Sequence, residues 1–203
     1  MSGFSSNEYW INRYVQGNNS GAGSYGRLAV YKANFVNTLV EVEAVQSVVE
    51  LGSGDGNQAG LFDIPQFTGL DISEDCVRKC NAQFSERSGW TFLLADAEVE
   101  PHDAALSLDV IYHLVEDDVF EVYMNRLFSL AKRFVVIYSS DFDFDTTDQH
   151  VRHREFSNWV ADQFPNWKMY CGETNPFNRD GHGNSRRYSF ASFIVFERAQ
   201  DSD

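Results

Sequence analysis

Short apolar runs recur along the middle of the chain, and most are followed by stretches in which apolar residues repeat every three or four positions. Such runs are typical of buried strands, and such repeats of helices. The runs predict strands near 46–51, 67–71, 91–94, 104–110 and 133–139. The repeats predict helices near 57–63, 73–85, 117–131 and 150–163. Strands that alternate with helices form a parallel sheet with helices on both faces.

The two ends of the chain depart from this alternation. Before the first strand, the apolar spacing predicts a short helix at 8–16 and a longer one at about 27–42. Near the other end, 167–171 and 189–196 have the pattern of strands, with no clear helix between them. Two such strands can pair as a hairpin, which adds an antiparallel strand to the parallel sheet.

The first predicted strand runs into a glycine-rich turn with the sequence Glu50-Leu51-Gly52-Ser53-Gly54-Asp55-Gly56. Three alternating glycines let the backbone approach a ligand that a Cβ atom would keep away. The helix predicted after the turn would offer free N–H groups to the same ligand. An ordinary strand-to-helix turn needs only one glycine, so the three together favour a binding site.

Two carboxylates follow the glycine turn, each at the end of an apolar run. Asp71 lies 19 residues after Gly52, and Asp96 lies 25 residues after Asp71. Nucleotide-binding α/β sheets hydrogen-bond a ribose with an acidic residue about 20 residues beyond such a turn. The spacing therefore predicts a nucleoside-binding site at the ends of the first strands.

At these residues the chain resembles the class I S-adenosylmethionine-dependent methyltransferases, over residues 45–140. The family's glycine motif, acidic-x-Gly-x-Gly-x-Gly, is matched in full, and Asp71 and Asp96 match its ribose and adenine-side acids. The resemblance implies a Rossmann-like seven-stranded sheet, mostly parallel, with an antiparallel C-terminal strand and helices on both faces. It implies S-adenosyl-L-methionine as cofactor, and these cofactor-binding residues: Glu50, Gly52, Ser53, Gly54, Gly56, Asp71, Ile72, Asp96, Ala97 and Asp109.

A length of 203 residues suits a single domain. We expect residues 1–44 to form a helical cap or lid, 45–140 the cofactor-binding core, and 141–203 an acceptor-side loop, a helix and the hairpin. In similar methyltransferases the segment before the first strand commonly folds over the cofactor, and a plain surface loop is the alternative. This segment holds a second glycine cluster, but no strand precedes it, so it is not a nucleotide fingerprint. Tyr25, in that cluster, is assigned to the acceptor site.

The loop after the fourth strand carries the candidate for acid–base chemistry. In similar methyltransferases this loop faces the acceptor, and here it contains Tyr112 and His113. An unperturbed histidine pKa of about 6.5 suits proton removal near neutral pH, so His113 is the candidate general base. The alternative is a histidine packed against the loop. Tyr112 is assigned to acceptor binding, with packing as its alternative.

The loop after the fifth strand is acidic and then basic. Its aspartates do not match a calcium loop, because Thr146 and Arg152 occupy the positions that need glycine and glutamate. Arg152, His153 and Arg154 follow, and they are assigned to an anionic part of the acceptor, because arginine binds phosphate and carboxylate bidentately. The alternative is charge balance against the aspartates of 141–148.

Composition limits the partners and the compartment. A net charge of −14 argues against nucleic acid and against an anionic membrane surface as partners. Three cysteines give neither a disulfide framework nor a set with zinc spacing, so we expect no metal. Residues 1–6 lack the features of a signal peptide, and no apolar run approaches the length of a membrane span. The sequence therefore predicts a cytoplasmic protein; it does not predict an oligomeric state.

Together these features predict a methyltransferase that acts on a small-molecule or glycan-like acceptor at oxygen. No Asn/Asp-Pro-Pro-aromatic or Pro-Cys sequence follows the fourth strand, which disfavours methylation of adenine N6 and cytosine C5. One alternative is a nucleotide-binding oxidoreductase, although the third glycine comes one residue too early for its fingerprint. The other is a non-catalytic module that keeps the cofactor fold.

Overall fold

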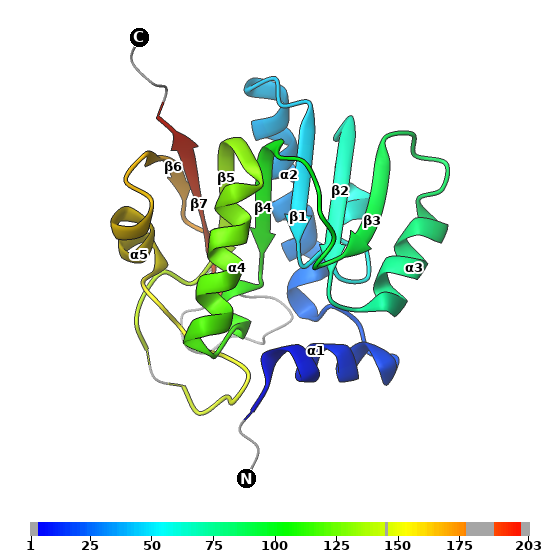
Figure 1. Ribbon diagram of the computed structural model, residues 1–203, viewed down its shortest axis with the longest axis horizontal. Coiled ribbons are helices and arrows are strands. Elements are labelled where there is room, and N and C mark those ends of the chain that lie inside the picture. The colour runs from blue at the N-terminus through cyan, green and yellow to red at the C-terminus, as the bar shows by residue number, and fades with distance from the viewer. Residues whose placement is uncertain (1–3, 145, 178–188, 200–203) are drawn as a thin grey trace.

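The centre of the molecule is one seven-stranded sheet in the order β3-β2-β1-β4-β5-β7-β6 (Figure 1). The computed structural model describes residues 4–144, 146–177 and 189–199. The strands are β1 Ser47–Leu51, β2 Gln66–Asp71, β3 Trp90–Leu94, β4 His102–Leu108, β5 Ala131–Ser139, β6 Trp167–Glu173 and β7 Ser192–Arg198. Strands β1 to β5 are parallel, and β7 is antiparallel to both β5 and β6. The predicted sheet and its antiparallel C-terminal strand are confirmed.

Helices cover both faces of this sheet, as Figure 1 shows. They are α1 Ser6–Val15, α2 Gly26–Val42, α3 Glu74–Gln83, α4 Asp117–Ser129 and α5 Phe156–Gln163, with 3₁₀ turns η1 Ala22–Ser24, η2 Ala59–Leu61 and η3 Ile111–His113. Successive strand residues point to opposite faces, so Val48 packs with α2 and Val49 with α4. No helix in the described part of the chain is long and apolar enough to cross a membrane.

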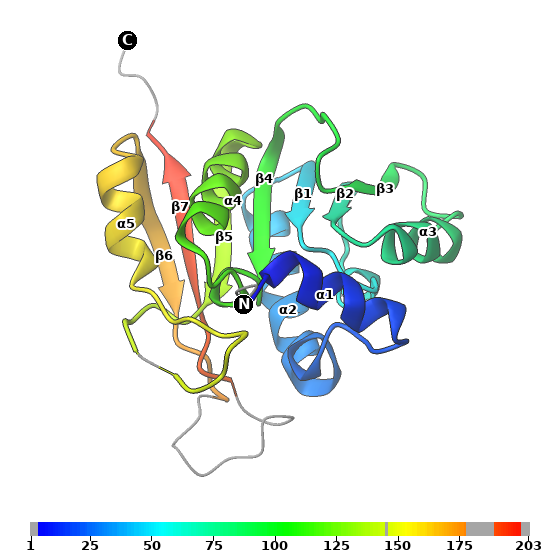
Figure 2. The ribbon, with the colours of Figure 1, turned by 60° about the horizontal axis from the view of Figure 1, so that its bottom comes forward.

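Helix α1 covers no face of the sheet and instead lies across the carboxyl ends of the central strands (Figure 2). At its start, the Ser6 N–H donates to Glu116 Oε1 at 2.9 Å. In its middle, the Trp10 ring lies edge-on to His113 with centroids 4.8 Å apart. At its end, the Tyr14 and Ser20 hydroxyl oxygens are 3.0 Å apart. These contacts hold α1 over the end of the sheet where parallel α/β proteins bind ligands.

The helix predicted at 57–63 is wrong, because only the three-residue turn η2 forms there. Gly56 has a left-handed φ of +77°, and Gly60 and Pro65 follow within nine residues. Glycine weakens a helix and proline ends one, so no full helical turn develops. The turn is therefore not followed by a helix N-terminus, and the expected helical N–H groups are not available to a ligand.

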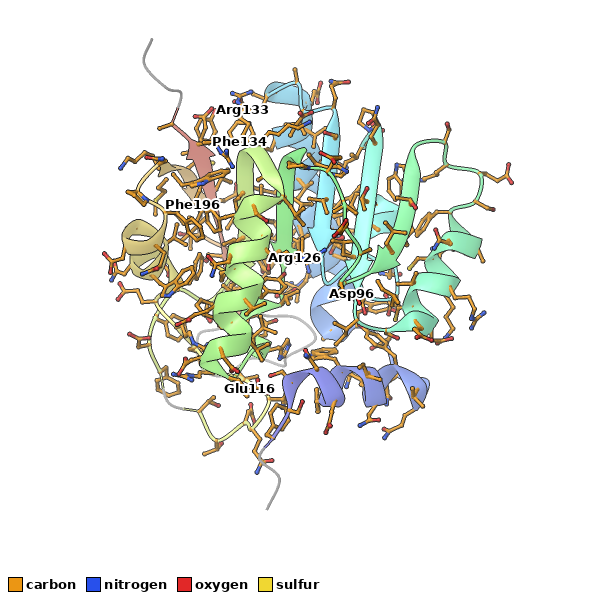
Figure 3. All side chains as sticks on the ribbon, in the orientation of Figure 1. Asp96, Glu116, Arg126, Arg133, Phe134 and Phe196 are labelled. Atoms are coloured by element: carbon orange, nitrogen blue, oxygen red, sulfur yellow. The ribbon has the colours of Figure 1, made fainter. Side chains whose placement is uncertain are left out.

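The amino-end side of the sheet, opposite α1, carries two ion pairs that join three segments of the chain. The Arg133 guanidinium bonds Glu43 at 2.6 Å and Glu197 at 3.0 Å. Figure 3 shows Arg133 and Phe134 at this end and Glu116 at the other. The cavities described next open at the carboxyl ends.

Candidate functional site

The turn after β1 requires glycine for two reasons: its backbone has positive φ angles, and neighbouring side chains leave no room for a Cβ atom. Gly52 has a φ of +83°, and a Cβ atom there would lie 2.6 Å from Val110 Cγ2. Gly54 has a φ of +57°, and its Cβ would collide with the Ser20 hydroxyl. The turn is fixed to β2, because the Gly52 N–H donates to the Leu70 carbonyl at 2.7 Å.

Asp71 closes β2 and bonds the same turn. Its Oδ2 accepts from the Gly54 N–H at 2.8 Å, and its Oδ1 accepts from the Ser73 N–H at 2.9 Å. Burial raises the pKa of Asp71, and these two N–H groups oppose the rise. Each carboxylate oxygen has a further lone pair, so Asp71 can still accept from a ligand hydroxyl.

Glu50, the acid of the glycine motif, lies in the core. It is 2% exposed, and its Oε2 has no hydrogen-bond partner among the residues that the structure describes. Burial raises the pKa of Glu50 to about 8, and the charge of Lys32 opposes the rise. The Glu50 carboxyl is therefore largely protonated at neutral pH.

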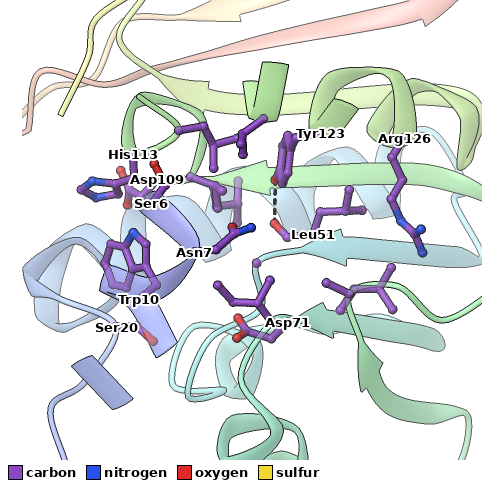
Figure 4. Close-up of a pocket in the computed structure, with 18 of the residues that line it drawn as sticks. Ser6, Asn7, Trp10, Ser20, Leu51, Asp71, Asp109, His113, Tyr123 and Arg126 are labelled. Carbon is purple, nitrogen blue, oxygen red and sulfur yellow. Dashed lines mark hydrogen bonds between the residues drawn. The ribbon is translucent and has the colours of Figure 1, made fainter. Parts of the chain in front are cut away.

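A cavity lies between the carboxyl ends of β1, β2 and β4 and helix α1 (Figure 4). Four of the predicted cofactor residues line it: Gly52, Asp71, Ile72 and Asp109. Figure 4 shows Trp10 and His113 at one end of this cofactor cavity and Arg126 at the other. Four other predicted cofactor residues belong to the segment of the glycine turn but do not line the cavity: Glu50, Ser53, Gly54 and Gly56.

The adenine-side acid is the predicted cofactor residue that the structure places differently. After β3 the chain turns sharply, because the Ala97 N–H donates to the Leu94 carbonyl at 2.9 Å. The turn leaves Asp96 exposed, and Ala95 lines the cofactor cavity in its place. The Ala97 carbonyl accepts from the Arg126 guanidinium at 2.6 Å. Asp96 and Ala97 as adenine ligands stay a prediction.

Asp109, directly after β4, is held in a conformation that non-glycine residues seldom adopt. Its φ is +62°. Its Oδ2 bonds Lys32 Nζ at 2.5 Å, and its Oδ1 accepts from the Tyr112 hydroxyl at 2.9 Å. The Lys32 side chain is 1% exposed, so this is a buried ion pair from α2. These two partners fix a carboxylate at the cavity wall.

Lys32 was missed in the sequence, although a signal was present. It lies four residues after Leu28 and three or four before Phe35 and Val36, on the apolar stripe of α2. A cation on the apolar face of a helix implies a buried anionic partner.

His113, in η3, is packed among rings. Its Nδ1 lies 2.8 Å from the His150 carbonyl oxygen, so Nδ1 carries the proton and Nε2 keeps its lone pair. Burial lowers the pKa of His113 to about 4. The imidazole is therefore neutral at physiological pH, and its pKa lies well below the value near 6.5 on which the sequence-based expectation rested.

A second cavity opens on the other side of α1, between α1, η3 and the segments before α5 and β7. Four residues line both cavities: Trp10, Ser20, Asp109 and His113. The two cavities thus meet at a carboxylate and a neutral imidazole. We call this second space the acceptor cavity.

The fold separates the basic and neighbouring residues at 150–154 into two groups. His150 and Val151 line the acceptor cavity, whereas Arg152, His153 and Arg154 do not. Both guanidinium groups bond Asp117 at the start of α4, at 2.9 Å for Arg152 and 3.1 Å for Arg154. These contacts favour the charge-balance alternative, although the partner is Asp117 and not the predicted aspartates. Anion binding by the arginines stays a prediction.

Two other assigned acceptor residues have partners within the chain. The Tyr25 hydroxyl donates to Asp55 Oδ2 at 2.7 Å and lines neither cavity, so it fastens the N-terminal loop to the glycine turn. His153 Nδ1 lies 2.8 Å from Ser140 Oγ. Tyr112, in contrast, lines the acceptor cavity.

Other lining residues were not predicted. Tyr123 lies with its hydroxyl 2.8 Å from both the Leu51 carbonyl oxygen and Ser107 Oγ, which ties α4 to β1 and β4. Arg126 lines the far end of the cofactor cavity, and its Nε is buried without a partner in the described part of the chain. Only the helical spacing of α1 and α4 was visible in the sequence, not the contacts of these side chains.

Comparisons with known proteins agree with this geometry. No protein-family model matches the chain, and no curated protein matches it in sequence. Among solved structures it is similar to the N-methyltransferase NodS from Bradyrhizobium japonicum WM9 in complex with S-adenosylhomocysteine, with 11% identity, 97% of this chain and 100% of that chain covered, and a TM-score of 0.72.

Two further structures extend this similarity. Magnesium protoporphyrin IX methyltransferase from Synechocystis PCC 6803 with bound S-adenosylmethionine is 14% identical, with 98% of this chain and 100% of that chain covered and a TM-score of 0.69. The mitomycin 7-O-methyltransferase MmcR is 14% identical, with 86% and 55% covered and a TM-score of 0.59. At such identities the similarity establishes the architecture. The chain has the fold of the class I S-adenosylmethionine-dependent methyltransferases.

Proposed function

We propose that the protein is an S-adenosylmethionine-dependent methyltransferase that modifies an oxygen atom of a small molecule. One observation carries the proposal: the cofactor cavity, built on the glycine turn and Asp71, meets the acceptor cavity at Asp109 and His113. A methyl donor and an acceptor can approach each other only where two such cavities join.

The residues present fit the cofactor. The glycine turn leaves no Cβ atoms against the cavity, and Asp71 has lone pairs for ribose hydroxyls. Arg126 Nε is buried without a partner in the described residues, so it has a free donor at the far end. We place the adenine end beside Ile72, Ala95 and Arg126, and Asp96 and Ala97 stay the predicted adenine ligands.

When bound, S-adenosylmethionine supplies a methyl group whose carbon–sulfur bond breaks with its electron pair left on sulfur. The acceptor oxygen must lose a proton as it is methylated. His113 Nε2 can receive that proton, because Nδ1 is held by the His150 carbonyl and the ring is neutral at physiological pH. A methylated oxygen that still carries its proton is strongly acidic, so even a weak base suffices, and positioning supplies most of the rate.

Isothermal titration calorimetry with S-adenosylhomocysteine and with NAD tests this proposal against the oxidoreductase alternative. We expect binding of S-adenosylhomocysteine alone. The sheet supports this outcome, because dinucleotide-binding domains typically have six parallel strands in the order 3-2-1-4-5-6. NAD binding would contradict the proposal, and cofactor binding without methyl transfer across an acceptor panel would favour a non-catalytic module. The cytoplasmic compartment and the absence of a nucleic-acid partner stay predictions.

A further inference from the structure

Six rings from four separate segments line part of the acceptor cavity. They come from α1, η3, the loop before α5 and the residue pair before β7: Tyr9, Trp10, Tyr112, His113, His150 and Phe190. The cavity measures about 270 Å³. Ligand pockets usually measure about 300–1,000 Å³, so this one suits a ligand of one or two rings.

These rings pack against one another as well as lining the cavity. Tyr9 stacks on His150 with centroids 5.0 Å apart, and His150 is nearly parallel to His113, at 12°. Tyr112 and Phe190 meet edge to face, with centroids 4.9 Å apart. The parts of these rings that line the cavity favour a planar π-system as ligand, because aromatic rings contact one another face to face or edge to face.

Some polar groups of the acceptor cavity are satisfied within the chain, whereas the Tyr9 hydroxyl, Trp10 Nε1 and the His150 ring nitrogens form no hydrogen bond in the part of the chain that the structure describes. The Ser20 hydroxyl accepts from the Asp55 N–H at 2.9 Å, the Ser189 hydroxyl accepts from the Ala191 N–H at 3.0 Å, and the Tyr112 hydroxyl donates to Asp109. Within the described residues, His113 Nε2 has no hydrogen-bond partner. Ligand hydroxyl groups directed at the satisfied side chains would stay unpaired, which costs affinity.

Resting on the function proposed above, we propose that the acceptor is a planar aromatic molecule of one or two rings that carries a hydroxyl group. The rings of the cavity hold its faces and edges. Its hydroxyl group lies at the junction, where it donates to Asp109 or His113. The proposal excludes the glycan-like acceptors that the sequence left open.

Calorimetric titration of the full chain with matched probes tests this proposal, in the presence and in the absence of S-adenosylhomocysteine. The probes are 2-naphthol, its saturated analogue decahydro-2-naphthol, and methyl α-glucopyranoside. The two bicyclic alcohols share a skeleton and a hydroxyl group and differ in planarity and π-electrons. We expect 2-naphthol to bind at least about tenfold more tightly than either other probe.

Variants then locate the bound ring. Phe190→Ala and Tyr9→Ala remove rings that line only the acceptor cavity, so each should weaken 2-naphthol binding about fivefold to tenfold and leave S-adenosylhomocysteine affinity unchanged. Tyr170→Ala is the control, because this ring lies on β6 and is 45% exposed. Two cavity variants keep the test valid when one of them fails to fold.

Each outcome has one meaning. Tight 2-naphthol binding that both cavity variants weaken supports the aromatic acceptor. Equal binding of the two bicyclic alcohols, or tighter binding of the glucoside, overturns it while the proposed function stands. Loss of 2-naphthol affinity in Tyr170→Ala alone also overturns it, because the ring would then bind elsewhere. If 2-naphthol binds as expected but S-adenosylhomocysteine does not, the proposed function fails and the ring site stands.

Discussion

The two cavities that meet at Asp109 are built in different ways. The cofactor cavity rests on a contiguous segment, Glu50 to Gly56, and on one carboxylate from the next strand. The acceptor cavity is assembled from segments between Tyr9 and Phe190, which come together only in the folded chain. Local backbone geometry therefore specifies the glycine-turn wall of the cofactor cavity, which α1 and α4 complete, whereas tertiary packing specifies the whole acceptor cavity. Variants on the cofactor side should act on backbone stability and affinity, whereas variants on the acceptor side should act on turnover.

The largest effect should come from Glu50→Gln. The pKa of this buried carboxyl is raised from 4.5 to about 8, so the folded state holds its proton more tightly than the unfolded state. The stability that this provides is present below about pH 4.5 and is lost as pH rises through about 8. Because other titrating groups such as His113 are common to both proteins, the unfolding free energy of wild type should fall by about 3–5 kcal/mol relative to that of Glu50→Gln between pH 5 and pH 9.

Urea denaturation of both proteins at pH 5 and at pH 9 measures this difference. A difference between the two proteins that stays constant across this range would show that the Glu50 carboxyl ionises without cost. Glu121→Gln, on the exposed surface of α4, is the control and should follow wild type.

The next largest effect should come from Asp71→Ala. The change removes the acceptor for the Gly54 N–H and, in our proposal, for the ribose hydroxyls. The affinity for S-adenosylhomocysteine should fall about 30- to 150-fold, or about 2–3 kcal/mol. Calorimetry measures it. Asp75→Ala is the control, because this partly exposed carboxylate pairs with Arg78 and Lys79 on α3. Equal affinities of the two variants would contradict the assignment.

On the acceptor side, His113→Ala should reduce turnover about tenfold to a hundredfold, with unchanged cofactor affinity. Because burial lowers the pKa of His113 to about 4, Nε2 is protonated only below that pH. The turnover of wild type should therefore fall as pH drops through about 4, and the turnover of the variant should not show this fall. Steady-state kinetics with the accepted aromatic alcohol measure both. His102→Ala, at the amino end of β4, is the control, and an acid limb near pH 6.5 would contradict the assigned pKa.

The smallest effect should come from Arg152→Ala. Its guanidinium is 46% exposed and pairs with an Asp117 that is 66% exposed, so the loss should cost about 0.2–1 kcal/mol of stability. The Michaelis constant of the acceptor should not change, because Arg152 lies outside the acceptor cavity. A clear rise in that constant, with stability unchanged, would restore the sequence-based assignment of an anion-binding arginine.

The sequence predicted the sheet and the glycine turn because both depend on local patterns. Apolar runs mark β1 to β5, and three glycines with left-handed φ mark the turn after β1. The helix at 57–63 was predicted wrongly, because apolar spacing took no account of Gly60 and Pro65. The pattern of apolar residues was therefore sufficient to predict the sheet, but it was not sufficient to predict the segments that connect the strands.

The acceptor side could not be predicted for a different reason. Whether Arg152 faces a ligand or Asp117 depends on how the loop after β5 packs against α4, and no sequence spacing encodes that packing. The pKa of His113 likewise depends on its burial beside His150 and Trp10. Both residues lie far from His113 along the chain, so no local pattern reveals this burial. Only Lys32 left a signal, as a cation on an apolar stripe.

The position of β7 has a consequence for how the chain is made. β6 pairs only with β7 among the strands described, and β7 lies between it and β5. During synthesis, residues 167–173 therefore leave the ribosome before any partner strand is available to them, and β5 exposes an unpaired edge until residues 192–198 follow. Unpaired edges can bind the edges of other chains. Translation that pauses or stops before β7 should thus yield an aggregation-prone chain, even though every cofactor-binding residue has already been made.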